Sequence, residues 1–224
     1  MMSFDKDRNL LIVSGAVTGT LGVYQVHGLP TCPSTQDDEA TTLTILHVND
    51  HHSHIEGDDM EMLVEDIGTV KFDYGGFPRL VSLINEIKSS ETNVLTLHAG
   101  DAISGTLWYS LFSETGAQPD AEMMGQACFD AFALGNHEFD DGDATLAKFL
   151  QNIAGTGCGT KVLAANVKPG PTSPLATGNL LKPYHVFTIG AAQVGVVGVD
   201  IKYKVSVNMC CCHIVITIHL PCAS

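Results

Sequence analysis

Three apolar runs in this sequence end in the same way, with polar, metal-binding residue types directly after the last apolar residue. They read ILHVNDHHSH, LTLHAGD and FALGNHEFD, and amphipathic segments lie between them. Strands that alternate with helices indicate an α/β fold with a largely parallel sheet. The carboxyl ends of neighbouring parallel strands meet at one edge of the sheet, where open α/β proteins place their ligands. The repeated ending therefore predicts both the fold class and a shared site.

The spacing of the apolar residues places the individual elements. Runs rich in β-forming residues predict strands, and apolar residues three or four positions apart predict amphipathic helices. The predicted strands lie at residues 43–48, 93–101, 130–136, 161–167 and 184–200, the last range holding two strands joined by a Gly-Ala-Ala turn. The predicted helices lie at residues 75–90, 119–129 and 143–154.

Local signals add detail to two of these helices. Pro78 suits the first turn of the first helix. Asp120 is a candidate N-cap of the second helix. The apolar face predicted for the first helix consists of Leu80, Leu83, Ile84 and Ile87.

The charge balance limits the partners that this chain can have. It carries 25 Asp and Glu against 11 Lys and Arg, a formal net charge of −14. A chain this acidic has no bulk attraction for nucleic-acid backbones or anionic membranes, so neither is expected as a partner. A phosphorylated substrate would need bound cations that offset the negative field locally. The densest acidic run is interpreted as an exposed loop or face and contains Glu56, Asp58, Asp59, Glu61, Glu65 and Asp66.

Residues 1–40 are interpreted as an N-terminal extension, or a weak secretory signal, followed by a linker. Their apolar stretch is too short and too polar to predict a membrane span. Asp5 and Asp7 oppose the signal interpretation, because a signal begins with positive charge. If residues 1–30 act as a signal, the protein is expected to be secreted or on the cell surface; otherwise it is expected in the cytoplasm.

Two candidate metal ligands follow the first predicted strand. Asp50 and His52 are two residues apart, so on an extended segment both point to the same side, while His51 faces away. A carboxylate with an imidazole suits a borderline divalent ion such as Zn²⁺, Mn²⁺ or Fe²⁺. A histidine-rich surface loop is the alternative interpretation, which this pattern alone leaves open.

The next two strand ends add further candidates. Asp101 follows Gly100, and although a Gly-Asp pair is usually a turn, this carboxylate ends a neighbouring strand and could bridge two cations. Asn136 offers a neutral carbonyl oxygen, which adds a contact to a cation without adding negative charge. His137 would face a substrate instead, with Asp140 placed to hydrogen-bond its imidazole and favour the protonated form.

The remaining polar residues near these strand ends are interpreted as structural. Glu138 is assigned no task in the site. His47 and His98 lie inside predicted strands and are interpreted either as core histidines with satisfied hydrogen bonds or as histidines that support the metal ligands from behind. Trp108 and Tyr109 are expected to pack a helix.

The segments ILHVNDHHSH, LTLHAGDAISGTL and DAFALGNHEFDDG, in this order and spacing, resemble the N-terminal domain of the 5′-nucleotidase family. That family belongs to the calcineurin-like metallophosphoesterases and includes bacterial UDP-sugar hydrolases. The resemblance covers about residues 43–200. It implies a layered sheet sandwich of the metallophosphoesterase type, flanked by helices, in a domain at residues 41–200 that is incomplete at its C-terminus.

The resemblance also implies a ligand set, carried over residue by residue. Asp50 and His52 resemble ligands of a first metal ion, and Asp101 resembles the carboxylate that bridges two ions. Asn136 resembles a ligand of the second ion. The implied cofactors are two divalent ions of the Zn, Mn, Fe or Mg class. This chain is expected to hold one of them or none tightly, because the family's further ligands are not found in it.

The remaining pair carries the implied chemistry. His137 and Asp140 resemble the residues that stabilise the transition state of a phosphoric ester hydrolysis. The implied reaction is in-line attack of hydroxide on phosphorus between two metal ions. Its substrate would be a nucleoside 5′-monophosphate or another small phosphate ester. His137 would donate to a phosphoryl or leaving-group oxygen as charge develops there.

The resemblance ends near residue 200. Family members continue with further ligands and with a C-terminal domain that binds the nucleoside or sugar, and neither is found in this sequence. Residues 201–224 lack Asp and Glu and hold four of the seven cysteines, namely Cys210, Cys211, Cys212 and Cys222. We interpret this segment as an aberrant Cys-rich tail from a truncated or mis-spliced gene, although IVITIHL resembles a strand that ends in a ligand histidine. The other cysteines show no spacing that indicates a disulfide framework.

The expected function is therefore a metal-dependent phosphoric ester hydrolase of the 5′-nucleotidase type, impaired in this chain by the missing ligands and substrate domain. The alternative is a non-catalytic fragment with at most weak binding of a single metal ion. A third interpretation keeps the enzyme but changes the substrate to cyclic nucleotides, UDP-sugars or sulfur esters. The sequence does not separate these substrates, because they would be chosen by the domain that is not found.

Overall fold

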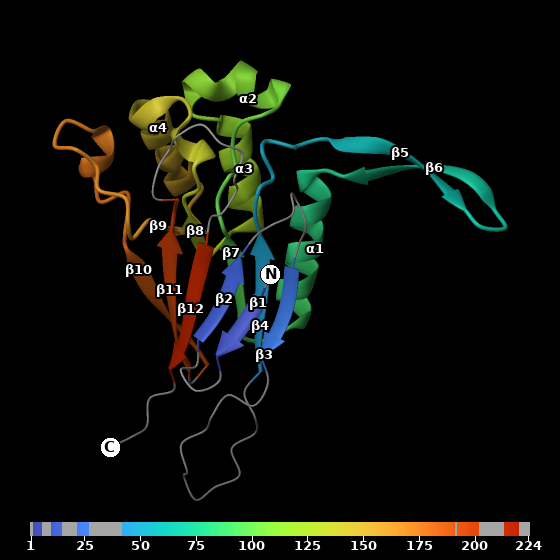
Figure 1. Ribbon diagram of the computed structural model, residues 1–224, viewed down its shortest axis with the longest axis horizontal. Coiled ribbons are helices and arrows are strands. Elements are labelled where there is room, and N and C mark those ends of the chain that lie inside the picture. Colours follow the sequence, from blue (N-terminus) through green and yellow to red (C-terminus); the bar gives the residue numbers. More distant parts are fainter. Residues whose placement is uncertain are drawn as a thin grey trace, which may run out of the picture.

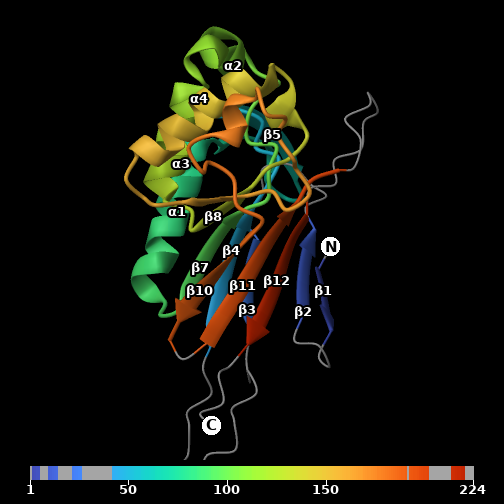
Figure 2. The same ribbon diagram turned by 90° about the vertical axis from the view of Figure 1, so that its left-hand side faces the viewer.

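The computed structural model describes residues 2–5, 10–14, 22–26, 42–190, 192–201 and 213–219. These residues form two five-stranded sheets and a separate two-stranded sheet. The two larger sheets pack face to face, and helices cover the other side of one of them (Figures 1 and 2). The sheet that helices cover on one side is called the inner sheet. The other five-stranded sheet is called the outer sheet.

The inner sheet carries the strand ends that hold the candidate site. Its strand order is β3-β4-β7-β8-β9. All neighbours are parallel except β3, which is an antiparallel edge strand. The strands are β3 (Gly22–Val26), β4 (Leu43–Val48), β7 (Val94–His98), β8 (Ala131–Ala133) and β9 (Lys161–Leu163). The four strands predicted between residues 43 and 167 and their parallel arrangement are therefore confirmed.

Strand β4 shows why the strands of this sheet appear in the sequence as continuous apolar runs. All six of its residues are buried, because a parallel strand in the middle of a layered fold is covered on both faces. Ile45 packs into the core between the two sheets, together with Val194 and Val196. Leu46 and Val48 point to the other face, into the core beneath the helices. The inner sheet is thus the layer that both cores share.

The outer sheet has the strand order β1-β2-β12-β11-β10, and all its neighbours are antiparallel. Its strands are β1 (Met2–Asp5), β2 (Leu10–Ser14), β10 (Tyr184–Ile189), β11 (Ala192–Val199) and β12 (His213–His219). The predicted hairpin of β10 and β11 is confirmed. Strands β1, β2 and β3 lie within residues 1–40, where no strand was predicted, and β12 contains the strand-like IVITIH. The division of the chain near residues 40 and 200 stays a prediction.

Helices cover the free face of the inner sheet (Figure 2). They are α1 (Phe77–Ser90), α3 (Gln118–Ala127) and α4 (Gly142–Gly155), with the short α2 (Leu107–Phe112) at the carboxyl edge of the strands. Three 3₁₀ turns connect them to other elements, at Ser113–Thr115, His137–Phe139 and Pro174–Ala176. The three predicted helices are confirmed. Within the described residues, none of the helices has the length and apolar content that a membrane crossing requires.

The apolar face of α1 is rotated from the one predicted. Phe77, Val81 and Ile84 are its buried residues, whereas Leu83 is 44% exposed. The rotation follows from Phe77 and Val81, which share the core with β4 and were left out of the predicted stripe. The assignment of Leu83 to the core face was therefore wrong.

The start of α3 also differs from the prediction. The helix begins at Gln118, its N-cap is Ala117, and Pro119 occupies the first turn. Asp120 therefore lies inside the helix, so its assignment as N-cap was wrong. Its side chain is 1% exposed and points into the protein. A short polar side chain that caps nothing and is buried must have partners elsewhere.

The acidic run after residue 56 is a β-hairpin rather than a loop. Strands β5 (Gly57–Val64) and β6 (Gly68–Gly75) pair over their full length. The hairpin projects away from the two sheets (Figure 1). Its side chains are mostly exposed, so the predicted exposure is confirmed and the loop alternative was wrong.

One disulfide joins Cys128, at the end of α3, to Cys158, just after α4. The spacing of the cysteines in the sequence did not indicate this disulfide. The two cysteines come together because α3 and α4 pack side by side on the inner sheet, a long-range arrangement that cysteine spacing does not reveal.

Removal of this disulfide should lower the free energy of unfolding by about 3–4 kcal/mol, the chain-entropy value for a loop of this length. The cross-linked residues are 30 apart in sequence. Urea unfolding of Cys128→Ala, Cys158→Ala and the double variant measures the effect. Because each substitution removes the same cross-link, all three variants should lose similar amounts; additive losses, or free thiols at both positions in the unreduced protein, would contradict the assignment.

Candidate metal centre at the strand ends

The loops after β4, β7 and β8 meet at the carboxyl edge of the inner sheet. The Asp50 N–H donates to the Gly100 carbonyl and the Ser53 N–H to the Ala102 carbonyl, both at 2.9 Å. These bonds continue the pairing of β4 with β7 beyond the strands. The loop after β8 approaches so closely that a Cβ on Gly100 would lie 2.6 Å from the Gly135 nitrogen. Glycine at position 100 therefore permits the convergence that the parallel strands predict.

Three of the candidate ligands have left-handed backbone conformations. The φ angles are 52° at Asp50, 44° at His52 and 52° at Asp101. Such angles are unfavourable for residues with a Cβ, and each costs on the order of 1–3 kcal/mol. They persist only where the surroundings hold them, and such positions cluster at functional sites. The strand ends are therefore shaped for a purpose other than a simple turn.

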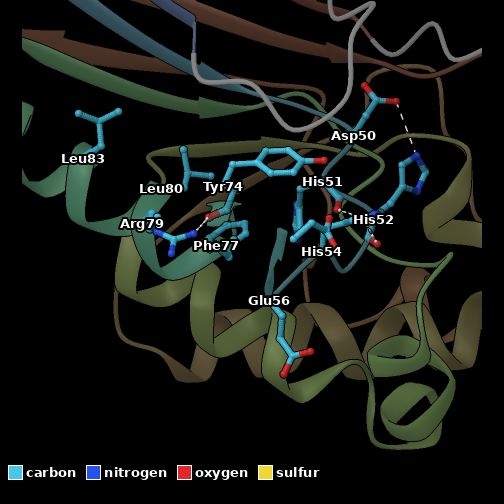
Figure 3. A pocket seen from close by; sticks show the side chains of 13 residues that line it. Asp50, His51, His52, His54, Glu56, Tyr74, Phe77, Arg79, Leu80 and Leu83 are labelled. Carbon is cyan, nitrogen blue, oxygen red and sulfur yellow. Dashed lines mark hydrogen bonds and ion pairs between the residues drawn. The ribbon is translucent and has the colours of Figure 1, made fainter. Parts of the chain in front are cut away.

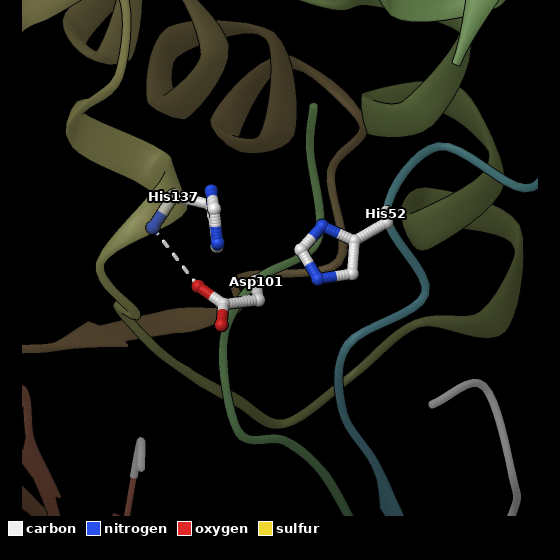
Figure 4. Close-up of side chains that lie close together, drawn as sticks. All are labelled: His52, Asp101 and His137. Atoms are coloured by element: carbon white, nitrogen blue, oxygen red, sulfur yellow. Dashed lines mark hydrogen bonds between the residues drawn. The ribbon is translucent and has the colours of Figure 1, made fainter. Parts of the chain in front are cut away.

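These loops bring His52, Asp101 and His137 together (Figure 4). One potential ligand atom from each lies within 4.8 Å of the others. The rings of His52 and His137 are 4.9 Å apart, and the His137 backbone N–H donates to Asp101 Oδ1 at 2.9 Å. Asp50 Oδ1 lies 3.8 Å from His52 Nε2. Two imidazoles and two carboxylates thus share one small volume.

Several buried acceptor atoms at these strand ends lack a donor. Among the described residues, no hydrogen-bond partner is found for the buried oxygens Asp50 Oδ1, Asp101 Oδ2 and Asn136 Oδ1. A buried acceptor without a donor is costly, and the cost disappears when a cation coordinates it. Oxygen and imidazole donors together suit Mn²⁺, Fe²⁺ or Zn²⁺. The residues present therefore fit a divalent metal ion.

The electrostatics of the cluster favour a cation as well. Burial, and then the nearby Asp50 carboxylate, raise the pKa of Asp101 to about 6, against the lowering effect of His137. Burial and the neighbouring His137 lower the pKa of His52, so that its ring is neutral at pH 7, the form in which histidine binds metal. A cation here would relieve the repulsion between two carboxylates that burial already disfavours.

His137 and Asp140 form the hydrogen bond that the sequence indicated. His137 Nδ1 donates to Asp140 Oδ2 at 2.7 Å, and both side chains are about one-third exposed. The bond fixes the orientation of the ring and leaves Nε2 available. The backbone of His137 is tied to Asp101 at the same time. The part that this pair takes in a reaction stays a prediction.

Glu138, which the sequence analysis left without a task, organises the loops. Its side chain is 1% exposed. Oε2 accepts from the backbone N–H groups of Asp101 (2.9 Å) and Gly135 (2.6 Å), and Oε1 accepts from that of Ala102 (2.7 Å). Burial, and then repulsion from Asp101, raise the pKa of Glu138 to about 8. Nothing in the spacing of the sequence marks this residue, because all three donors are backbone groups of loops.

Tyr109 is a second supporting residue that the sequence analysis missed. It was expected only to pack a helix, and it is indeed buried. Its hydroxyl also donates to Asp141 Oδ2 at 2.8 Å. Since Asp141 directly follows Asp140, this bond anchors the segment that carries the His137 partner. Trp108 stacks on Phe112 within α2, as expected for packing.

A cavity of about 650 Å³ opens beside the cluster, between the strand ends and the base of the β5–β6 hairpin (Figure 3). Asp50 and His52 form part of its wall, and Tyr74, Phe77 and Leu80 form another part. Its volume is within the range of small-molecule sites. The cluster is therefore reachable by a small ligand.

The fold and the site define a class of protein. An inner parallel sheet whose strand ends carry Asp-x-His, Gly-Asp and Asn-His, packed against a second sheet, matches the family model "Calcineurin-like phosphoesterase" over residues 43–185. The chain belongs to this family. Phosphoesterases of this kind use divalent metal ions, in agreement with the orphaned acceptors described above.

Within the family, the chain is similar to 5′-nucleotidases. It is 40% identical over 169 residues to the NAD 5′-nucleotidase of Haemophilus influenzae, a match that covers 75% of this chain and 26% of that protein. The chain spans about a quarter of the length of the curated relatives it matches.

Solved structures agree with the sequence comparison. The Haemophilus influenzae NAD nucleotidase superposes with a TM-score of 0.63 at 39% identity, over 71% of this chain and 30% of that one. A 5′-nucleotidase precursor from Thermus thermophilus superposes with a TM-score of 0.58 at 35% identity, over 70% of this chain and 28% of that one. The layered fold inferred from the strand endings is therefore confirmed.

The raised pKa of Glu138 predicts how metal-free protein responds to pH. A folded pKa of about 8 lies above the usual glutamate value of 4.5, so the folded state binds the proton more tightly than the unfolded state. Its contribution to stability is complete below pH 4.5 and is lost as the pH rises through about 8. Urea unfolding in EDTA should therefore show this contribution falling by at least ~1.4 kcal/mol, the value of one pKa unit.

Two comparisons isolate this effect. Glu138→Gln should flatten the pH dependence, whereas Glu86→Gln, which changes an exposed glutamate of α1, should leave it unchanged. Saturating Mn²⁺ should raise the free energy of unfolding more at about pH 8 than at about pH 5, because protons compete with the metal ion at low pH. Equal slopes in wild type and Glu138→Gln would show that Glu138 does not titrate in this range.

Proposed function

We propose that this chain provides the metal-binding part of a phosphoesterase centre that removes phosphate from nucleoside 5′-monophosphates or related small esters. The observation that carries the proposal is the grouping of His52, Asp101 and His137, together with donorless buried oxygens on Asp50, Asp101 and Asn136 at the strand ends. The names of the relatives, which are 5′-nucleotidases, support the nucleotide class of substrate. Cyclic nucleotides, UDP-sugars and sulfur esters are the alternative substrates.

The proposed metal ligands fall into two groups. Asp50, His52 and Asp101 would hold one divalent ion, and Asp101 with Asn136 would contact a second. Zn²⁺, Mn²⁺, Fe²⁺ and Mg²⁺ are the candidate ions. Divalent cations, when bound, offset the negative charge of phosphoryl oxygens and make a nucleophile available at neutral pH. Asn136 suits this task because it contributes an oxygen without further negative charge in an already acidic site.

The role proposed for His137 follows from its hydrogen bonds. Asp140 accepts the Nδ1 proton and so directs Nε2 away from the bond. The His137 backbone is held by the Asp101 carboxylate, which keeps the ring beside the ligand cluster. From there Nε2–H would donate to a phosphoryl or leaving-group oxygen as charge develops on it. Asp140 would stabilise the imidazolium, as carboxylates do in other His-carboxylate pairs.

We further propose that this chain is a weak enzyme. Among the described residues we assign only Asp101 and Asn136 to the second ion, and two ligands are too few for tight binding. A non-catalytic chain that binds a single ion weakly is the second candidate, favoured by the same observation. The number of tightly held ions separates these two from a fully competent centre.

The disulfide supports a proposal about where the protein folds. Disulfides form and persist in oxidising compartments and are rare in the cytosol. Cys128–Cys158 is therefore best explained if the chain is exported. Free thiols at both positions in protein isolated from its own cells would count against export.

Substitution of the histidine tests the proposed reaction. His137→Asn should slow phosphate release from AMP, with Mn²⁺ in excess, by about 10²- to 10⁴-fold, the usual contribution of a general acid. Asp140→Asn should slow it less, because the ring remains while its orientation is lost. His185→Asn serves as the control, since His185 lies in β10 of the outer sheet. Equal rates in His137→Asn and wild type would exclude the assigned role.

Metal stoichiometry tests the proposed impairment. After equilibration of the full chain with Mn²⁺ and gel filtration, we expect about one ion or less to remain per chain, because the second ion has only two ligands among the described residues. Metal analysis by mass spectrometry gives the number. Two retained ions, together with a turnover of about 10 s⁻¹, the median for enzymes, would contradict the proposed impairment of this chain.

A further inference from the structure

A line of buried polar contacts runs from helix α3 to the loop that carries Asp101. Asp120 Oδ1 lies 3.4 Å from His51 Nε2. His51 Nδ1 lies 2.9 Å from His98 Nε2. His98 Nδ1 in turn accepts the backbone N–H of Gly100 at 3.2 Å. Asp120, His51 and His98, called the relay below, thus connect three elements that are separate in the sequence.

Hydrogen-bond logic fixes the direction of the relay. A backbone N–H can only donate, so Nδ1 of His98 must be the bare acceptor and its proton must sit on Nε2. That proton is donated to His51 Nδ1, so the proton of His51 must sit on its Nε2, where it faces the Asp120 carboxylate. Two neutral rings satisfy the hydrogen bonds from Gly100 to His98 and from His98 to His51, while His51 Nε2 faces the Asp120 carboxylate at 3.4 Å without a hydrogen bond. Reversal of either ring would place two donors or two acceptors against each other.

The surroundings leave the rings little freedom. His98 is 0% exposed, His51 3% and Asp120 1%. Phe77 contacts the ring of His51 edge-on at a centroid distance of 4.6 Å (Figure 3). Phe129 and Phe132 contact the ring of His98 at 5.2 Å and 5.4 Å. Burial lowers the pKa of His98 well below its usual value, so the ring is neutral, as the relay requires.

The Asp120 end of the relay is also explained by its position. Asp120 lies in the first turn of α3, where the partial positive charge of a helix N-terminus stabilises a carboxylate. Among the described residues neither of its oxygens has a hydrogen-bond partner, and neither has His51 Nε2, which lies 3.4 Å from Oδ1, so the contact between them is electrostatic. This arrangement accounts for a buried aspartate that does not cap its helix.

The relay ends on the turn that aims Asp101. Gly100 and Asp101 have φ angles of 97° and 52°, so the turn is unfavourable unless it is held. Three successive N–H groups of this turn donate to buried side chains: Gly100 to His98, and Asp101 and Ala102 to Glu138. Glu138 therefore holds one side of the turn and the relay holds the other.

We propose that Asp120, His51 and His98 are positioning residues, which lock the Gly100–Asp101 turn so that the Asp101 carboxylate faces His52 and His137. None of the three is itself assigned as a metal ligand. Their effect on metal affinity rests on the proposed metal site, but the relay itself is a property of the metal-free protein. The alternative is that His51 and His98 are ordinary core histidines that do not influence Asp101.

The first test reads the tautomers directly. Long-range ¹H–¹⁵N NMR spectra of the metal-free full chain should show both His51 and His98 as neutral rings that are protonated at Nε2. In Asp120→Leu the His51 ring loses its acceptor, and its Nε2 proton should become exchangeable or its tautomer mixed. A His98 ring protonated at Nδ1 would overturn the proposal, whatever the protein's activity.

The second test measures Mn²⁺ affinity by titration calorimetry. His98→Phe fills the same volume without the hydrogen bonds and should weaken binding by about tenfold or more, as changes to residues behind metal ligands usually do. His47→Phe is the matched control, a second buried histidine one strand away, and should stay within about threefold of wild type. Equal affinities in the two variants would refute the proposal.

The aspartate provides a rescue experiment that does not depend on the histidine variants folding. Asp120→Leu should weaken Mn²⁺ binding by about tenfold, whereas Asp120→Asn keeps an oxygen acceptor for His51 and should remain within about threefold. Equal losses in both would indicate a merely structural aspartate and overturn the relay. If wild type binds no Mn²⁺, the proposed function fails, and the tautomers still decide the relay.

Discussion

The candidate site depends on one buried carboxylate that never needs to touch a ligand. Glu138 accepts from the backbone of two different loops, at Asp101 and Ala102 on one side and at Gly135 on the other. Because strained turns relax unless several bonds hold them, this side chain fixes the distance between the loops after β7 and β8. Together with the bond from the His137 N–H to Asp101 Oδ1, it gives Asp101 and the Asn136–His137 pair a common frame. The ligand geometry is thus set from behind the site rather than within it.

The same arrangement destabilises the metal-free protein electrostatically. Asp50, Asp101 and Glu138 place buried carboxylates close together in a chain whose net charge is already −14. Burial, and then the Asp50 carboxylate, raise the pKa of Asp101, and burial, and then Asp101, raise that of Glu138. Backbone N–H groups satisfy Glu138, but the outward oxygens of Asp50 and Asp101 remain without donors among the described residues. A cation bound there would remove this penalty, and folding and metal binding would then be coupled through the same atoms.

The sequence predicted the features that depend on local residues and missed those that depend on contacts between distant segments. Apolar runs located the strands, and because parallel strands share an edge, their endings located Asp50, His52, Asp101, Asn136 and His137. Glu138 was missed because its partners are backbone groups, and Cys128–Cys158 because its partners meet only after α3 and α4 pack. Asp120 was misread as a cap because the cap signal is local, whereas its partner His51 lies far away in sequence. Residue type was informative where sequence neighbours determine the role of a residue. It was not informative where that role depends on long-range packing.

The edge that holds the site continues into the outer sheet. At the end of β9, Asn166 Nδ2 donates to the Asp200 carbonyl and Asn166 Oδ1 accepts the Asp200 N–H, at 2.7 Å and 3.0 Å. This reciprocal pair joins the carboxyl ends of β9 and β11. A Cβ on Gly198 would lie 2.4 Å from the Leu163 carbonyl oxygen, so the two sheets approach each other closely there. The described ligand candidates all come from the inner sheet, yet the carboxyl end of β11 is held by this contact at the same edge. Glycine at position 198 and the Asn166–Asp200 pair therefore hold the carboxyl end of β11 beside that of β9.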